Sequence, residues 1–163
     1  MTDPEDALAE LLGDTDGPMW ILTVSTGDER SGCLIGFATQ VSIDPARFLA
    51  CVSKVNHTFG LAARAEHLAV HVAPTDDDGE LARLFGEETG DEVDKFDRCR
   101  WHEGPEGQPV LDGCPGWFVG HVVARHDLGD HVGLVLEPVA VQGRVEDHMT
   151  LDEAKELDAG HPA

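Results

Sequence analysis

One stretch of this sequence is set apart by what it lacks. The chain holds 32 acidic residues in 163 and has a formal net charge of −21, yet residues 45–65 contain no aspartate or glutamate. One interpretation is a pair of buried strands, which exclude charge. The other is a pocket that holds an anion on a protein whose remaining surface repels anions. The two interpretations are compatible, so we expect the rest of the fold to be arranged around this stretch.

The composition restricts the possible partners. A sequence pI of about 4.4 argues against nucleic acids and anionic membrane surfaces, which need a basic footprint. No apolar run is long enough to span a bilayer, and the first residues contain no apolar signal region, so we expect a cytoplasmic protein of one domain. The four cysteines, Cys33, Cys51, Cys99 and Cys114, form no Cys-x-x-Cys pair, and we expect free thiols.

Short apolar, β-branched segments separated by turn residues predict a strand-rich fold. Strands are expected at residues 19–25, 31–42, 47–53, 67–73, 117–127 and 131–145. Short helices are expected at residues 6–12, 56–63, 77–85 and 150–157, with Asp77 in a capping position. Pro138 indicates an edge or a bulge in the last strand. The pattern favours a mainly β, α+β protein built as a closed antiparallel barrel with helical additions.

Other chemistries find little support in the sequence. His67 and His71 would adjoin only on a helix, whereas their segment has the pattern of a strand. Cys99 and His102 offer two metal ligands without a second pair at a useful spacing, so we expect no metal site. The sequence contains no Walker loop, no Gly-x-Gly-x-x-Gly turn and no Gly-x-Ser-x-Gly elbow. Nucleotide binding through the first two motifs, and a serine nucleophile of the third kind, therefore have no support.

A cluster of polar residues follows the third predicted strand. It consists of Ser53, Lys54, Asn56, His57 and Thr58, within the acid-free stretch. Hydroxyl, ammonium and amide groups at a helix start are suited to binding a phosphate, whose attached group would lie along the apolar residues 33–38. The alternative is a capped helix after a core strand, with no ligand.

Several segments, in order, resemble the flavin reductase-like family. Residues 32–45, Gly-Cys-Leu-Ile-Gly-Phe-Ala-Thr-Gln-Val-Ser-Ile-Asp-Pro, are similar to its signature strand pair, and residues 48–58 to its following strand and phosphate segment. Residues 81–85 with Lys95-Phe96 resemble its "Leu-Ala-x-x-Phe … Lys-Phe" element. Residues 107–112 and 129–131 complete the order, so that the resemblance covers about residues 19–141.

The resemblance implies an antiparallel split β-barrel of the FMN-binding type. Residues 19–147 would form this domain, between an N-terminal helix and linker at 1–18 and a short C-terminal helix and tail at 148–163. It implies a homodimer that binds FMN, with FAD possible, oxidises NADH or NADPH, and passes reduced flavin to a monooxygenase. Two alternatives remain: a non-enzymatic flavin carrier or electron-transfer flavoprotein, and a split barrel that uses deazaflavin, haem or pyridoxal phosphate.

The resemblance also assigns residues to the cofactor. They are Leu34, Ile35, Gly36, Phe37, Ala38, Thr39, Cys51, Val52, Ser53, Lys54, Asn56, His57, Thr58, Lys95 and Phe96. His131 would line the nicotinamide side as the candidate catalytic residue; the alternative is a histidine that merely begins a strand after a hairpin.

The sequence departs from the family pattern at four of its positions. Leu34, Gly36 and Phe37 stand where the family usually has Thr, Ser and Ser, and Ala46 replaces the second proline. Polar side-chain contacts to the flavin ring would therefore be lost, while backbone contacts persist.

Overall fold

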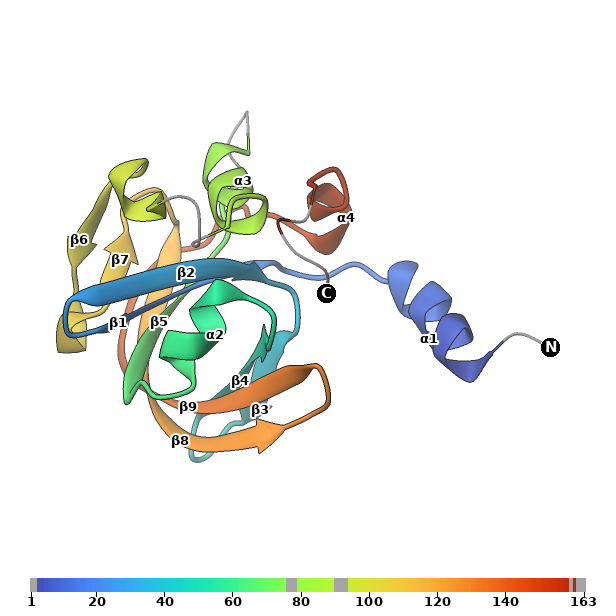
Figure 1. The fold of residues 1–163 in the computed structure, drawn as a ribbon, viewed down its shortest axis with the longest axis horizontal. Helices are drawn as coiled ribbons and strands as arrows, with labels where there is room; N and C mark the ends of the chain where they lie inside the picture. Colours follow the sequence, from blue (N-terminus) through green and yellow to red (C-terminus); the bar gives the residue numbers. More distant parts are fainter. Residues whose placement is uncertain (1–2, 76–78, 90–93, 159, 161–163) are drawn as a thin grey trace.

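The computed structural model describes residues 3–75, 79–89, 94–158 and 160. Seven strands form one antiparallel sheet in the order β2-β1-β5-β8-β9-β4-β3 (Figure 1). They are β1 (Trp20–Thr26), β2 (Glu29–Ile35), β3 (Ala38–Ser42), β4 (Arg47–Ser53), β5 (His67–Val72), β8 (Gly116–Asp127) and β9 (His131–Gly143). A second, two-stranded sheet pairs β6 (Trp101–Glu103) with β7 (Pro109–Leu111). The expectation of a mainly β protein is confirmed.

The largest difference from the sequence prediction lies at residues 31–42, which were expected to form one strand. The structure divides them into β2 and β3, the two edges of the large sheet, at Gly36-Phe37. The chain crosses here from one edge to the other, and the Phe37 carbonyl accepts a hydrogen bond of 2.9 Å from the Cys51 amide of β4. No ladder joins β2 to β3 among the described residues. The barrel is therefore split, as the resemblance implied, and the expectation of a closed barrel was wrong.

Pro138 does mark a bulge, as predicted. Val119 of β8 lies opposite Ala140 of β9, whereas the next residue, Gly120, lies opposite Pro138. Proline cannot donate to the ladder, so an irregularity is tolerated at this point.

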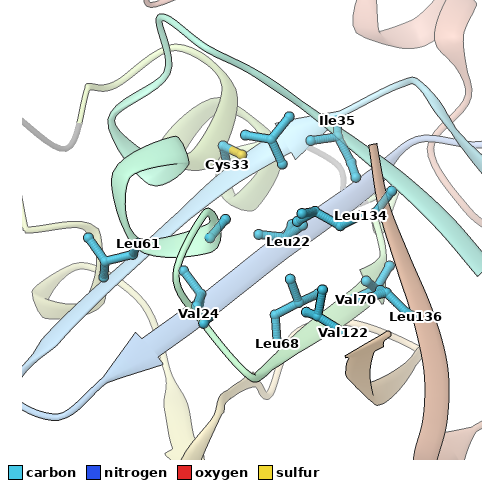
Figure 2. Close-up of a cluster of buried hydrophobic side chains, with 14 residues drawn as sticks. Leu22, Val24, Cys33, Ile35, Leu61, Leu68, Val70, Val122, Leu134 and Leu136 are labelled. Carbon is cyan, nitrogen blue, oxygen red and sulfur yellow. The ribbon is translucent and has the colours of Figure 1, made fainter. Parts of the chain in front are cut away.

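Strand β1 is buried on both faces. Its residues Leu22 and Val24 enter the barrel core, where side chains from β2, α2, β5, β8 and β9 converge (Figure 2). Ile21 points to the other face and belongs to a second cluster with Phe85 and Leu111. This double burial explains why β1 lacks the alternation of a strand with one wet face.

The helices are short and lie around the sheet. They are α1 (Pro4–Gly13), α2 (His57–Ala62), α3 (Glu80–Gly86) and α4 (Leu151–Ala154), with 3₁₀ turns η1 (Lys95–Asp97) and η2 (Pro105–Gly107). Asn56 caps α2 as predicted, and α4 is shorter than expected but begins with a capping box at Thr150. Asp77 lies outside the described residues. None of the helices in the described ranges has the length and apolar character needed to cross a membrane.

Candidate functional site

The crossing between the two sheet edges forms the wall of a pocket of about 150 Å³. Its lining consists of Cys33, Leu34, Ile35, Gly36, Phe37, Cys51, Ser53, Asn56 and His131. All except Cys33 were assigned to the site from the sequence. Cys33 was not assigned individually because its place in an apolar strand predicted only a buried thiol, although it lies in the stretch 33–38 expected along the ligand; in the structure it is 1% exposed.

Strand register places the candidate catalytic histidine at this pocket. Strand β4 pairs with β9 so that Ser53 lies directly opposite His131. The Phe37 ring lies against the His131 ring with centroids 5.0 Å apart. On the other side, His131 Nδ1 lies 2.8 Å from a carboxylate oxygen of Asp130. The imidazole is therefore held between a ring and a carboxylate, and this hydrogen bond lowers the pKa of Asp130.

One lining hydroxyl has no partner. Ser53 Oγ is buried and makes no hydrogen bond among the residues that the structure describes. Buried polar groups are almost always paired, and an unpaired one calls for an explanation such as a bound molecule. Beside it, the Phe37 side chain is 65% exposed. The pocket thus combines an apolar, partly open wall with a polar group that lacks a partner.

Lys54 lies in the acid-free stretch of the sequence, but the fold brings acidic residues next to it. Its ammonium group lies 2.8 Å from a carboxylate oxygen of Asp127, and its backbone amide donates to the Asp130 carbonyl. Asp127 is the last residue of β8 and Asp130 lies in the turn that leads to β9, both far from Lys54 in the sequence. The hydrogen bond from Lys54 lowers the pKa of Asp127. Lys54, Asp127, Asp130 and His131 together are called the pocket rim below.

The other predicted site residues lie outside the pocket lining. Val52 belongs to the barrel core, and Ala38 and Thr39 continue into β3. Thr58 is fully buried, and its hydroxyl lies 2.8 Å from that of Ser31. His57 is the first residue of α2. The Thr58 amide donates a hydrogen bond to the side chain of Asn56, which caps α2. This is the capped helix that the sequence analysis gave as the alternative to a phosphate site.

Lys95 and Phe96 lie behind β2. The Lys95 ammonium group donates to the Gly32 carbonyl at 3.0 Å and the Phe85 carbonyl at 3.2 Å. Burial lowers the pKa of Lys95. Phe96 packs edge-on against Phe85 and Trp101 in the second apolar cluster. The structure therefore does not bring either residue to the pocket.

These features define a split-barrel protein with a small pocket at the crossing of its edge strands. The model of the flavin reductase-like domain matches residues 12–157, and the chain belongs to this family. It is 30% identical over 117 residues to an FMN reductase (NADH) of Agrobacterium fabrum, covering 72% of this chain and 64% of that protein. It is also 30% identical to a stachydrine N-demethylase reductase subunit of Rhizobium meliloti, covering 70% of this chain and 50% of that protein. The chain thus spans about half to two thirds of the length of these relatives.

A solved structure gives the same fold. The NADH:FAD oxidoreductase of Streptomyces globisporus superposes with a TM-score of 0.82 at 26% identity, covering 92% of this chain and 90% of that one. The chemistry of the lining suits a flavin, whose ring needs an apolar wall and whose ring edge needs polar partners, although the pocket of about 150 Å³ encloses only part of such a ligand. Residues 34–37 would supply the wall, and the unpaired Ser53 hydroxyl would supply a polar partner.

Proposed function

We propose that this chain is a flavin reductase that oxidises NADH and reduces FMN, with FAD as the alternative flavin. The observation that carries the proposal is the pocket at the β2–β3 crossing, with its unpaired Ser53 hydroxyl, in a chain of this family. A bound flavin supplies the ring that accepts the hydride. The chain would contribute orientation: Ser53 would donate a hydrogen bond to the flavin, Phe37 would form a side wall, and Asp130, hydrogen-bonded to His131, would hold that ring in place for the nicotinamide.

We favour NADH over NADPH because the FMN reductase of Agrobacterium fabrum, 30% identical to this chain, carries NADH in its name.

We also infer a homodimer. The pocket of about 150 Å³ is smaller than the 300–1,000 Å³ of ordinary ligand sites, so a second copy would complete it. Four exposed aliphatic side chains at the end of β3 and on β9 offer apolar surface to such a copy: Val41, Ile43, Val139 and Val141, with exposures of 50%, 85%, 47% and 75%. Arg47 of β4 lies between the two strands, since it is opposite Ser42 of β3 in the sheet and reaches Glu137 of β9 at 3.0 Å.

We propose that the reduced flavin passes to a monooxygenase. Relatives include the reductase component of a flavin-dependent trigonelline monooxygenase of Acinetobacter baylyi, 26% identical. A cytoplasmic location is part of the same proposal. The alternative, a flavin-binding protein without reductase activity, is supported by the likeness to an FMN-binding protein of Thermus thermophilus, with a TM-score of 0.73 at 26% identity.

The test uses the purified chain titrated with FMN, FAD and riboflavin, followed by NADH oxidation with each flavin. We expect flavin binding, a melting temperature that rises with FMN concentration, and NADH oxidation that depends on flavin. Ser53→Ala should weaken binding at least threefold, whereas Ser42→Ala, outside the pocket, should not. FMN binding without NADH oxidation would favour the carrier. A colourless protein whose melting temperature is unaffected by FMN and FAD would contradict the proposal.

A further inference from the structure

The pocket has two walls that come from separate parts of the large sheet. One wall is the end of β2 with the crossing, residues 33–37, and the other holds Cys51, Ser53 and Asn56 from β4 and the start of α2. Strands β2 and β4 form no ladder with each other among the described residues. Helix α2 packs against both strands (Figure 1). The width of the pocket therefore depends on contacts between the walls other than strand pairing.

Hydrogen bonds connect the two walls at both ends of the pocket. At one end, the Cys51 amide donates to the Phe37 carbonyl at 2.9 Å. At the other end, the Ser31 hydroxyl of β2 and the Thr58 hydroxyl of α2 lie 2.8 Å apart. On each wall, the lining residues lie between these two connections in the sequence. We call Ser31 and Thr58 the hydroxyl pair.

The hydroxyl pair is buried in apolar surroundings. Ser31 is 5% exposed and Thr58 is fully buried. Ser31 lies opposite Val24 in the sheet, and Leu61 lies one helical turn beyond Thr58; both belong to the apolar core. Hydrogen bonds are directional, and a fully satisfied buried bond specifies one arrangement of the groups that it joins. The pair therefore fixes the start of α2 relative to β2.

Thr58 passes this constraint to a residue that lines the pocket. Its backbone amide donates a hydrogen bond of 2.9 Å to the Asn56 side chain, which is part of the lining. Helix α2 has only six residues, so its first turn is a large part of it. Holding Thr58 against β2 therefore also holds Asn56 at a set distance from the β2 wall.

We propose that Ser31 and Thr58 are positioning residues of the flavin site: the hydroxyl pair sets the width of the pocket and thereby the affinity for the flavin ring. Neither residue belongs to the lining, so both act through Asn56 and the β2 wall. The inference rests on the proposed function, because it concerns the flavin that the pocket would hold. Loss of the pair frees α2 to move relative to β2, and the walls no longer keep the spacing that suits the ring.

The test compares Ser31→Ala, Thr58→Val and the double variant by FMN binding, riboflavin binding and urea unfolding. Each single variant leaves one buried hydroxyl without its partner, so both the unfolding midpoint and the affinity should fall. In the double variant both hydroxyls are gone, and the midpoint should return close to that of the wild type. Its dissociation constants for both flavins should stay about fivefold above the wild-type values, because the walls are still not connected.

Two further variants serve as controls. Thr58→Ser keeps the hydroxyl and should restore both dissociation constants to within about twofold of the wild-type values. Thr23→Val makes the same change as Thr58→Val at another fully buried threonine, whose hydroxyl donates to the Pro109 carbonyl at 2.5 Å. Thr23 lies outside the pocket lining, so this variant should lower the unfolding midpoint without changing flavin affinity.

The outcomes separate this inference from the proposed function. A wild type that binds flavin, with a double variant that binds it equally well, would overturn the positioning role and leave the proposed function intact. A loss for FMN with riboflavin unaffected would show that Thr58 meets the phosphate itself, which also overturns it. A wild type that binds neither FMN nor FAD would overturn the proposed function and the positioning role together.

Discussion

The two lysines assigned to the cofactor in the sequence analysis occupy opposite environments. Lys54 lies at the pocket rim, partly exposed, with its charge paired to Asp127. Lys95 is 6% exposed behind β2, and its ammonium group donates to the Gly32 and Phe85 backbone carbonyls. His71 resembles Lys95 in this respect, since Nδ1 lies 3.0 Å from the Ile21 carbonyl and Nε2 accepts from the Leu111 amide at 3.0 Å. We call Lys95 and His71 the buried ties.

The difference separates stability from binding. The buried ties connect β2 to α3 and β1 to β7, so changing them leaves buried carbonyl or amide groups without partners. The rim charges are exposed, and exposed ion pairs contribute little to stability. They lie beside the pocket and can act on an anionic ligand. Variants of the ties should therefore alter unfolding, and variants of the rim should alter flavin affinity.

The largest expected effect is that of Lys95→Glu. A carboxylate would face the Gly32 and Phe85 carbonyl oxygens in a buried position, which we expect to cost about 4 kcal/mol of unfolding free energy. Lys54→Glu, the matched control, should cost less than about 1 kcal/mol. Urea unfolding of both variants measures the difference. Equal losses would show that the two lysines support the fold alike.

His71 predicts a pH dependence of stability. Burial lowers its pKa from 6.5 to about 4, against the opposing effect of its bond to Ile21. Between these values the unfolded chain binds a proton that the folded chain does not, so stability falls as the pH falls. A difference of this size amounts to about 3 kcal/mol, fully present above pH 6.5 and lost by about pH 4.

Replacing His71 separates its contribution to the pH dependence of unfolding from that of the carboxyl groups that titrate in the same pH range. His71→Gln keeps a donor and an acceptor without the ionisation, so its unfolding free energy should fall less steeply from pH 6.5 to 4.5 than that of the wild type. Parallel slopes for His71→Gln and the wild type would remove His71 as the cause.

Two glycines, Gly32 in β2 and Gly36 at the crossing, also separate an effect on stability from an effect on flavin binding. A Cβ at Gly32 would lie 2.6 Å from Phe85 Cε1 and 3.0 Å from the Leu22 carbonyl. We expect Gly32→Ala to cost about 2 kcal/mol by overpacking. At Gly36 the nearest atom is Met19 Sδ at 3.3 Å, on a flexible side chain. Gly36→Ala should therefore cost under about 1 kcal/mol, with its main effect on FMN affinity. The reverse order would contradict the comparison.

Local patterns predicted the individual elements well. The boundaries of β4 are those expected, Asn56 caps α2, and Pro138 lies at a bulge. What the sequence could not show is which strands are neighbours. The uncharged residues 31–42 had the pattern of one strand. The break at Gly36-Phe37 follows from tertiary structure, since the chain there passes from one edge of the sheet to the other, and the local pattern does not record this.

The pocket was predictable in part for the same reason. The local pattern indicated the apolar stretch 33–38 and the polar cluster at 53–58, and the family resemblance assigned individual residues, including Gly36, Phe37 and His131. Asp127 and Asp130 were missed because a turn far along the chain brings them to Lys54. The Lys95 tie was missed because its partners are backbone carbonyls, which leave no trace in side-chain patterns.

The smallest expected effect concerns the pocket rim, where two substitutions should act in opposite directions. If Lys54 meets the FMN phosphate, Lys54→Glu should weaken FMN about tenfold, or about 1.4 kcal/mol, because a charge-assisted contact is replaced by repulsion. Asp127→Asn should instead tighten FMN about threefold, since it removes the carboxylate that lies 2.8 Å from the same ammonium group. Riboflavin, which has no phosphate, should bind all three proteins alike.

Fluorescence quenching gives the dissociation constants. Equal losses for FMN and riboflavin in Lys54→Glu would assign the lysine to the ring or the fold, and two variants with FMN affinity unchanged would place the phosphate away from this rim.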